Sequence, residues 1–534
     1  MKNKYKYIVL SIIPVSLLLY SVIMRYAEGP FYFNTLYDPC YVYLINSLNL
    51  AQFIAPAHFD HPGTPVQIIG AIVIKITHLF NNKTGDISVD VLSDPEYYLS
   101  MIHITLAIIN SIILYISSLI IYKATKNIYV SLLLQLSPFI SYMVSYELSV
   151  ITAETFMISV IMLLIAYSIK FIYTEKSSKT NFVIIFSLLS GLGLATKITF
   201  APLFVIPLIL LKGIREKLKY TVLTTLSFIL FFLPSISNTG YFFNWIKSLF
   251  LFDGLYGKGN PVIIDISASL VHLKNIFAED ILFGIIYFLI VLTFLITYQS
   301  IKKSGITDSV RSEIKLLFAI LISMSLQILI VAKHYSGHYI VPALMLSMTG
   351  LYLCVRLYSN SGFRFSGKGR TDFVYASIIA IIVTITVVGT FFNYKQQSSL
   401  RNNAQETIAF IKSHSADGTL VSSYGSSSIS YALAFSTYWA GENTFKYKEI
   451  IHDIYPEDLY YDFWGNKIYS ISEDNSLDKT FTENHKIYFQ NRYEESVSKI
   501  LKDLKTNYNF KDYTISNIYT SGNGEKIFEI CLNK

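Results

Sequence analysis

The stretch LSMIHITLAIINSIILYISSLIIY, residues 99–122, contains no Asp, Glu, Lys or Arg and indicates the fold class of the chain. A helix of about 20 apolar residues crosses the hydrocarbon core of a bilayer, which is about 30 Å thick. Similar runs recur through the first three quarters of the sequence, and 52% of all residues are hydrophobic whereas 15% are charged. So few charges cannot cover soluble domains of this total size. We therefore predict an α-helical membrane protein that crosses the bilayer several times.

About eleven segments have the length and composition of transmembrane helices. The first has the basic flank of a signal peptide but no small-residue cleavage site, so it is predicted to remain as a membrane span. Pro65–Phe80 is predicted to be an interfacial helix, because a twelfth span would reverse every later segment against the charge rule. The predicted spans are Ile8–Met24, Leu99–Tyr122, Ile128–Ser145, Val150–Ile172, Phe182–Thr196, Phe200–Leu211, Thr221–Ile236, Ile281–Tyr298, Leu316–Val331, Ile340–Val355 and Phe373–Phe392.

Basic residues mark alternate connectors between these spans. Cytoplasmic connectors of membrane proteins carry an excess of Lys and Arg, which predicts a cytoplasmic N-terminus in the cell (inner or plasma) membrane and, with an odd number of spans, an extracytoplasmic C-terminus. The net charge of +7 is spread over these connectors, so a lipid bilayer rather than a nucleic acid is the expected partner. The connector residues are Lys123, Lys126, Lys170, Lys176, Lys179, Arg215, Lys217, Lys219, Lys302, Lys303, Arg311, Arg356, Arg364, Lys368 and Arg370.

This topology predicts two domains. Residues 1–393 form the membrane domain, with two large outer loops at about residues 25–98 and 238–280, and residues 394–534 form a small extracytoplasmic α/β domain. The second domain contains no nucleophile elbow, P-loop or dinucleotide fingerprint, and the three cysteines of the chain lack the spacing of a metal site. Its predicted elements are helices near residues 404–413, 429–435 and 493–505 and strands at 419–423, 513–519 and 526–531.

Two acidic motifs stand in the first outer loop. Asp38, in Tyr37-Asp38-Pro39, follows the first span closely, where a lipid phosphate and a water-soluble substrate can meet. Asp60 and His61 belong to the second motif, Asp60-His61-Pro62-Gly63-Thr64-Pro65. Its two prolines and its glycine restrict the conformation of the backbone around these two residues. Each motif also has a purely structural interpretation, because Asp38 can cap a helix and Thr64-Pro65 can begin one.

An acid after the first span, followed by an HPP-like motif that leads into an amphipathic helix, resembles the GT-C glycosyltransferases. Within that superfamily it is most similar to the protein O-mannosyltransferase and aminoarabinose (lipid A) transferase group. Three other stretches agree: SVITAETF with Glu154, SGLGLATK with Lys197, and KHYSGHYIVPAL from Lys333. The sequence departs from the family pattern at two places. It has Tyr37-Asp38-Pro39 where relatives often show paired acids, and it has HPGTP where they have HPPL.

The resemblance implies a membrane hexosyl- or pentosyltransferase that takes a sugar from a polyprenyl phosphate. A composition rich in Ile, Lys, Asn and Tyr favours a bacterial carrier, undecaprenyl phosphate. The acceptor would be an extracytoplasmic glycan, lipid or protein, and the anomeric carbon would be inverted. Asp38 would be the general base, a role that contributes about 10²- to 10⁴-fold in rate.

The resemblance also implies substrate-binding residues. Lys197 would hold the donor phosphate, unless it snorkels to the interface. Glu154 would bind sugar, orient Lys197, or join His338 on a divalent metal ion, the one candidate cofactor. Phosphate or sugar would also contact Lys333, His334, His338 and Tyr339. Asp60 and His61 would shape the pocket, and His61 would also orient Asp38.

Three other functions share parts of this pattern. A lipid-linked sugar transporter or flippase would show paired halves and charges at mid-membrane, whereas the ionisable residues here gather at the outer helix ends. A polysaccharide polymerase or ligase of another membrane fold would have arginine-rich outer loops, and these loops are nearly free of arginine. A non-catalytic receptor would bind its ligand through the C-terminal domain.

Overall fold

The structure is a computed structural model that describes residues 2–58, 62–174, 180–254, 257–301, 307–360, 368–415, 417–456, 459–462, 465–471, 486–507 and 512–533. By contacts the chain forms two compact units. The helical unit comprises Met1–Val22, Phe59–Val66 and Ile104–Phe391, and the mixed unit comprises Ile23–His58, Gln67–His103 and Phe392–Lys534. The contacts thus group most of loop 25–98 with the C-terminal sheet, whereas the domain boundary near residue 393 stays a prediction.

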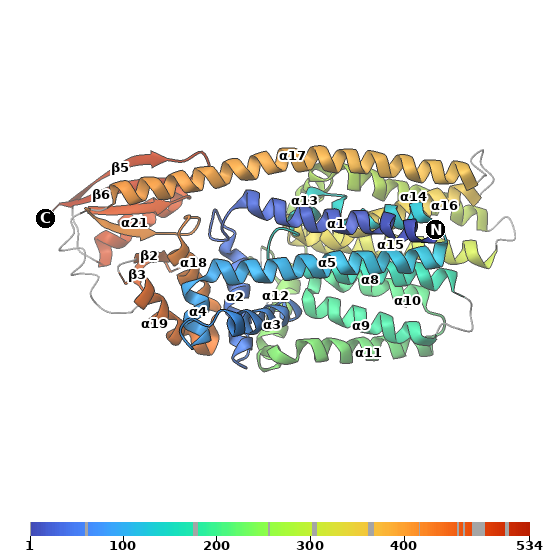
Figure 1. Cartoon of the computed structure of the whole chain (residues 1–534), viewed down its shortest axis with the longest axis horizontal. Helices are drawn as coiled ribbons and strands as arrows, with labels where there is room; N and C mark the ends of the chain where they lie inside the picture. Colours follow the sequence, from blue (N-terminus) through green and yellow to red (C-terminus); the bar gives the residue numbers. More distant parts are fainter. Residues whose placement is uncertain are drawn as a thin grey trace. The chain divides into compact units, whose positions relative to one another are not determined.

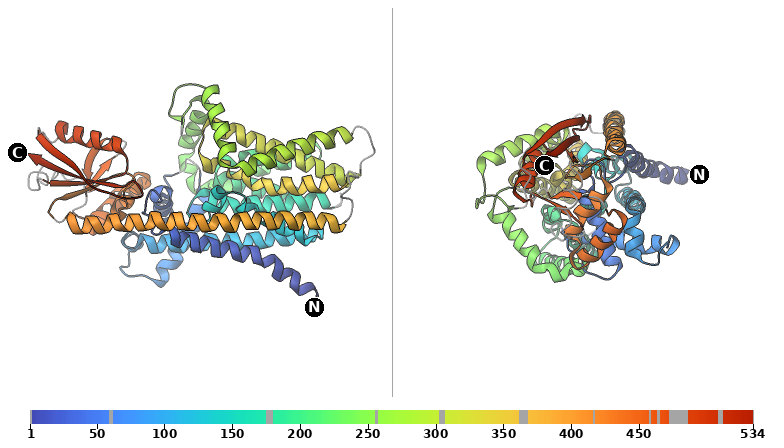
Figure 2. Two further views of the ribbon diagram at one scale, coloured as in Figure 1. Left: turned by 90° about the horizontal axis from the view of Figure 1, so that it is seen from above. Right: turned by 90° about the vertical axis from the view of Figure 1, so that its left-hand side faces the viewer.

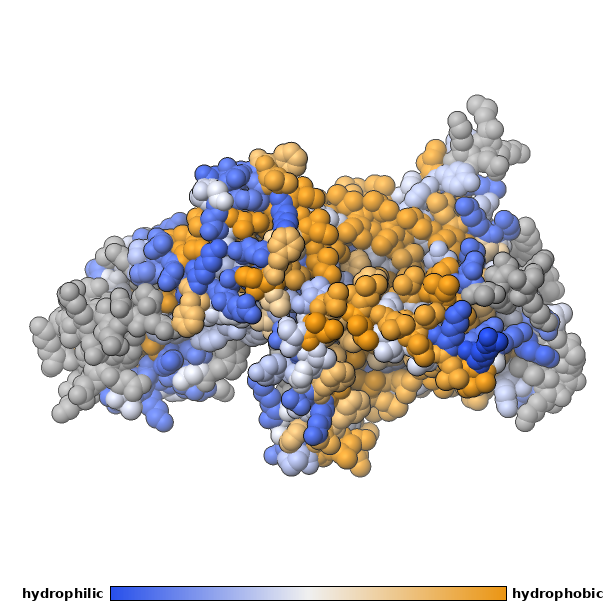
Figure 3. Space-filling model, turned by 90° about the horizontal axis from the view of Figure 1, so that it is seen from below, coloured by the Kyte–Doolittle hydropathy of each residue, from blue (hydrophilic) through white to orange (hydrophobic). Residues whose placement is uncertain are grey.

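Eight helices in the described part of the chain are long and apolar enough to cross a membrane. Their exposed faces are apolar: on α5 (Pro95–Thr125) the side chains of Ile104, Ile108, Ile112 and Ile116 recur every fourth residue and are each at least 40% exposed. Figure 3 shows hydrophobic residues over much of the surface of these helices. Such a stripe fits lipid and would be unfavourable in water. The other long helices are α1 (Lys2–Glu28), α8 (Ala153–Tyr173), α11 (Ile214–Phe232), α14 (Ile281–Ile301), α15 (Asp308–Lys333), α16 (Val341–Asn360) and α17 (Lys368–His414).

One predicted span is wrong as a continuous helix. Residues 128–145 form three short pieces, α6 (Ile128–Gln135), η1 (Ser137–Phe139) and α7 (Tyr142–Tyr146), because Pro138 has no N–H to continue the helix. Irregular backbone at membrane depth requires cover by protein, and Gln135 donates to the carbonyl of Leu10 at 2.9 Å while both are buried.

Two further predicted spans lie in shorter apolar helices. Residues 182–196 belong to α9 (Thr180–Thr196), and residues 200–211 lie in η3 (Ile198–Phe204) and α10 (Val205–Leu210). The segment predicted at 221–236 begins earlier, at Ile214 in α11, and continues through η4 (Leu233–Asn238) into α12 (Thr239–Leu251). Loop 238–280 is therefore largely helical, since α13 (Ile266–Glu279) follows.

The described ends of several helices that flank the basic connectors meet at one end of the helical unit. Hydrogen bonds and an ion pair join the start of α1 to the end of α5, the start of α6 to the start of α17, and the end of α16 to the starts of α15 and α17 (Figure 1). This common end agrees with connectors that share one side of a membrane. The contacts are Lys6–Tyr122, Asn127–Asp372, Ser359–Thr371 and Glu313–Arg356.

The mixed unit contains a six-stranded sheet with the order β3-β2-β1-β4-β6-β5. Strand β1 runs parallel to both β2 and β4, whereas β3, β5 and β6 pair antiparallel. One face packs on α21 through Ile500 and Leu504, and Tyr431 of α18 contacts Tyr460 on the other face, so helices lie on both sides of the sheet (Figure 2). The elements are β1 (Thr419–Ser422), α18 (Ile429–Ser436), α19 (Thr444–Ile454), β2 (Leu459–Asp462), β3 (Lys467–Ser470), β4 (Lys486–Asn491), α21 (Glu494–Asn507), β5 (Asp512–Thr520) and β6 (Lys526–Asn533).

The predicted combination of membrane helices with a small α/β domain is confirmed. Every predicted element of residues 404–531 is present, but the helix near 404–413 is the end of α17, which continues without a break from the span at 373–392. The sequence turns polar after Phe392 and contains no proline before His414, so a change of polarity ends the apolar run but not the helix.

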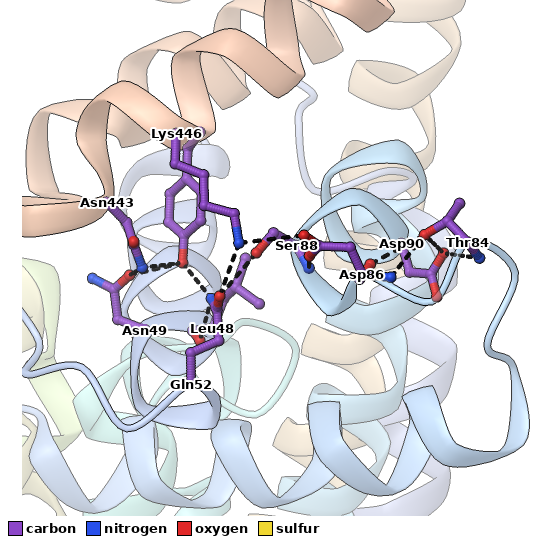
Figure 4. Close-up of polar contacts among 10 residues, drawn as sticks. Leu48, Asn49, Gln52, Thr84, Asp86, Ser88, Asp90, Asn443 and Lys446 are labelled. Carbon is purple, nitrogen blue, oxygen red and sulfur yellow. Dashed lines mark hydrogen bonds and ion pairs between the residues drawn. The ribbon is translucent and has the colours of Figure 1, made fainter.

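Loop 25–98 packs on the C-terminal elements through polar contacts of α2 (Tyr37–Ala51) and α4 (Ile87–Ser93), while α3 (Thr64–Phe80) confirms the helix predicted at 65–80. Asn49 of α2 accepts hydrogen bonds from Asn443 at 2.9 Å and from Tyr447 at 2.8 Å. Lys446 of α19 pairs with Asp86, which caps α4, and donates to Gln52 (Figure 4). The largely buried amides make this a specific contact, because each would be costly without its partner.

Candidate functional site

The backbone of Asp38 separates its carboxylate from helix α2. Asp38 has φ −100° and ψ 106°, which is not helical, and its peptide bond to Pro39 is cis. The carboxylate accepts a hydrogen bond from the hydroxyl of Tyr424 at 3.3 Å. The interpretation of Asp38 as a helix cap is therefore not supported, because its bond goes to a tyrosine that lies 386 residues away in sequence.

The Asp38 carboxyl group combines solvent exposure with a raised pKa. The side chain is exposed to solvent, yet the protein is dense around it. Burial among these atoms raises the pKa of the Asp38 carboxyl, and the hydrogen bond from Tyr424 offsets part of the rise. An accessible acid whose pKa is shifted toward neutrality is suited to accept a proton from a substrate.

Glu154 and Lys197 form a buried ion pair in the helical unit. Their side chains are 2% and 3% exposed, and the Lys197 ammonium donates to Glu154 Oε1. Glu154 lies in the first turn of α8, where the helix dipole favours an anion, and Lys197 follows the last residue of α9. The alternative that Lys197 snorkels to the interface does not hold, because its ammonium is directed to a buried carboxylate.

His338 and Tyr339 complete this cluster. His338 Nε2 lies 3.9 Å from Glu154 Oε1, and the Lys197 ammonium lies 4.9 Å from the centre of the Tyr339 ring. The His338 side chain is 36% exposed, so it is the accessible member of the group. The structure thus brings together four of the predicted site residues, which come from α8, from the α9–η3 junction and from η6 (Gly337–Ile340).

The HPGTP motif meets the same helix end. The Gly63 amide donates to the carbonyl of Thr196 at 3.0 Å, one residue before Lys197, and Gly63 has a φ of +68° that favours glycine. Thr64 Oγ1 lies 3.2 Å from Ser235 Oγ. Asp60 and His61 fall outside the described residues, so their predicted roles stay predictions.

Lys333 and His334 are engaged with loop 238–280. The Lys333 ammonium donates to the carbonyls of Leu249 and Phe250 at 2.7 and 2.6 Å, and the His334 ring nitrogens each lie 2.7 Å from a carbonyl oxygen, of Gly254 and Leu249. Both residues therefore fix the end of α12, and their prediction as substrate ligands stays untested. Lys197, His338 and Tyr339 are the better placed part of the predicted set.

A divalent metal site has a weak basis in these residues. Within the described ranges, no three His, Cys, Asp or Glu side chains lie close enough together to hold a metal ion. Glu154 and His338 provide only two donors, and Glu154 is already neutralised by Lys197. Two donors are fewer than a tightly bound transition metal needs.

Comparisons with known proteins found similarity to solved structures but not to a described family. No family model matches the sequence, and no curated protein matches it. Among solved structures, the chain is similar to ArnT from Cupriavidus metallidurans bound to undecaprenyl phosphate, with a TM-score of 0.49 and 9% identity over 98% of this chain and 97% of ArnT. Such an identity does not transfer residue roles from one protein to the other.

Sequence reasoning missed Tyr424. It lies two residues after the end of β1, in Ser423-Tyr424-Gly425-Ser426-Ser427-Ser428, and the amide of Gly425 donates to the Tyr37 hydroxyl at 2.7 Å. The position after a parallel strand was the available signal, because loops at the carboxyl ends of such strands hold ligands in open α/β sheets.

Proposed function

We propose that this protein is a membrane glycosyltransferase that moves a sugar from a polyprenyl phosphate to an extracytoplasmic acceptor, with Asp38 as general base. The observation that supports this proposal is the accessible Asp38 carboxylate, ten residues after α1, with a raised pKa and a tyrosine partner from the C-terminal domain. The apolar helix faces provide the surface that a prenyl chain would contact.

In the proposed step, Asp38 accepts the proton of the acceptor hydroxyl as its oxygen attacks the anomeric carbon of the donor. The bond from that carbon to the phosphate oxygen breaks, and its electron pair leaves with the phosphate. Attack from the face opposite the phosphate inverts the anomeric carbon. The leaving phosphate gains charge, so a nearby cation lowers the barrier.

The Lys197 cluster is the proposed site of that charge stabilisation. Lys197 has three N–H donors, of which Glu154 takes one, and the exposed edge of His338 is the point at which a phosphate or sugar oxygen would first make contact. Glu154 then orients Lys197 rather than binding a metal.

Transfer by the purified protein in lipid nanodiscs tests the proposal. The donors are hexoses and pentoses, each linked to undecaprenyl phosphate, the lipid bound in the ArnT structure. The acceptors are extracted glycan, lipid and protein fractions of the cell envelope. We expect release of undecaprenyl phosphate that depends on an acceptor fraction. Failure to transfer any sugar of the panel to any fraction would refute the transferase proposal.

The pH dependence of kcat/KM provides a sharper expectation. Asp38 accepts a proton only when ionised, so activity should fall as the pH decreases through its raised pKa. Tyr424→Phe removes a hydrogen bond that favours the ionised form, so the pKa should rise further and the fall in activity should move to higher pH. An unchanged acidic limb in this variant would contradict the assignment of Asp38 as base.

We also propose that the N-terminus and the basic connectors are cytoplasmic and that the C-terminal domain is extracytoplasmic. Reporter fusions after Lys126, Lys219 and Arg370 should report a cytoplasmic location, and a fusion at Lys534 the opposite one. A cytoplasmic reporter at Lys534 would place the Asp38 site on the wrong side for this function.

A further inference from the structure

The C-terminal sheet has a topological switch point between β1 and β4. These two strands are parallel and adjacent, with Ser422 opposite Gln490 near their carboxyl ends. The chain leaves β1 toward α18 on one face of the sheet and leaves β4 toward α21 on the other face. Ligands of open α/β sheets bind outside the carboxyl ends of the strands at such a point.

The segments that follow these strands, residues 423–428 and 492–493, are here called the switch edge. The rings of Tyr424 and Tyr493 are stacked with centres 6.0 Å apart, and Tyr493 is 40% exposed. Gly425, with a φ of +91°, allows the two segments to approach, because a Cβ there would lie 2.8 Å from Arg492 Cβ. The edge therefore brings the Tyr493 ring and the side chain of Arg492 close to Gly425.

A buried carboxylate fixes the switch edge. Glu525 is fully buried and accepts hydrogen bonds from the amide and hydroxyl of Ser427 and from the side chain of Gln490. Burial raises the pKa of Glu525, and these donors act in the opposite direction. Because the first segment and the end of β4 are tied to one acid, the edge is held in a defined shape for a ligand.

Loop 25–98 attaches to the switch edge at Asp38. The Tyr37 hydroxyl accepts from Gly425, Asp38 accepts from Tyr424, and Asn34 accepts from Arg492 at 3.5 Å. Among the described residues, no carboxylate pairs with the Arg492 guanidinium. Hydrogen bonds thus join the proposed base to the switch edge within the mixed unit.

We propose that the switch edge is the acceptor subsite and that it binds a sugar ring of the acceptor. Tyr493 and Tyr424 would pack against the C–H face of the ring, Arg492 would donate to its hydroxyl or anionic oxygens, and one hydroxyl would reach Asp38. Convergent aromatic and polar groups of this kind are typical of small-ligand sites. The assignment to the acceptor rests on the proposed glycosyl transfer.

Saturation-transfer NMR on the full chain in nanodiscs tests binding without requiring catalysis. The probes are the methyl glycosides of glucose, galactose, mannose and N-acetylglucosamine, together with glucose 6-phosphate. We expect a signal from at least one probe with wild type and with Asp38→Asn, and at least a fivefold loss with Tyr493→Ala and with Arg492→Ala. The control Phe445→Ala removes a 69% exposed ring of α19 and should change nothing.

The possible results separate the two proposals. No signal from any probe, or equal signals in wild type and Tyr493→Ala, would overturn the subsite. A phosphate preference that Arg492→Ala abolishes would support the role of the guanidinium. If binding requires Tyr493 but the protein transfers no sugar, the transferase proposal and the acceptor assignment are both overturned. The switch edge would then remain a carbohydrate-binding site. In an active enzyme, Tyr493→Ala should raise the acceptor KM and leave the donor KM unchanged.

Discussion

Replacement of Asp38 by asparagine is expected to lower the turnover of glycosyl transfer by about 10²- to 10⁴-fold. Asparagine keeps the size of the side chain and an oxygen that accepts from Tyr424, but its amide does not accept a proton from the acceptor hydroxyl. The carboxylate is exposed, so the substitution should change the free energy of unfolding by less than about 1 kcal/mol. Turnover and thermal unfolding of the purified protein check both expectations.

Asp462→Asn is a matched control for this variant. Asp462 also accepts a hydrogen bond from a tyrosine hydroxyl, that of Tyr438 at 2.9 Å, and it belongs to the same unit at the end of β2. Its replacement should leave turnover within about twofold of wild type, because surface substitutions away from a site have small effects. Equal turnover of wild type and Asp38→Asn would reject the base assignment, whatever the control does.

Local sequence patterns predicted most of the helices and several strands, because apolar runs and alternation report how each segment is buried. They did not predict β2, β3 and β4. Short strands such as β3 (Lys467–Ser470) depend on pairing with neighbouring strands for their stability. They also did not predict the break at Pro138, since hydropathy does not distinguish one helix from three short buried pieces.

Contacts across long sequence separations limited the prediction of the site. The family resemblance predicted that Glu154 could orient Lys197 or join His338, but their meeting depends on how α8, α9 and η6 pack. The contact of Tyr424 with Asp38 had no signal in the sequence beyond the position of Tyr424 after a strand. Lys333 has the same chemistry as Lys197 but lies against backbone carbonyls, a difference that only the fold determines.

Disruption of the Glu154–Lys197 pair is expected to have the largest effect on stability. Lys197→Met leaves the Glu154 carboxylate buried without its cation, and Glu154→Gln leaves the ammonium without its anion. Removal of one partner of a buried ion pair typically costs about 3–5 kcal/mol, so each single variant should unfold at a clearly lower temperature and lose transfer. Thermal unfolding in detergent and donor turnover measure the two losses.

The double variant Glu154→Gln with Lys197→Met separates structure from function. It leaves no unpaired charge, so most of the lost stability should return, because replacement of a buried pair by neutral residues is often close to neutral. Turnover should remain low, since the proposed cation for the leaving phosphate is absent. The pair Glu313–Arg356, at the opposite end of the helical unit, is the control: Glu313→Gln with Arg356→Met should retain turnover. If the Glu154–Lys197 double variant transfers sugar at the wild-type rate, the pair is structural and the donor phosphate binds elsewhere.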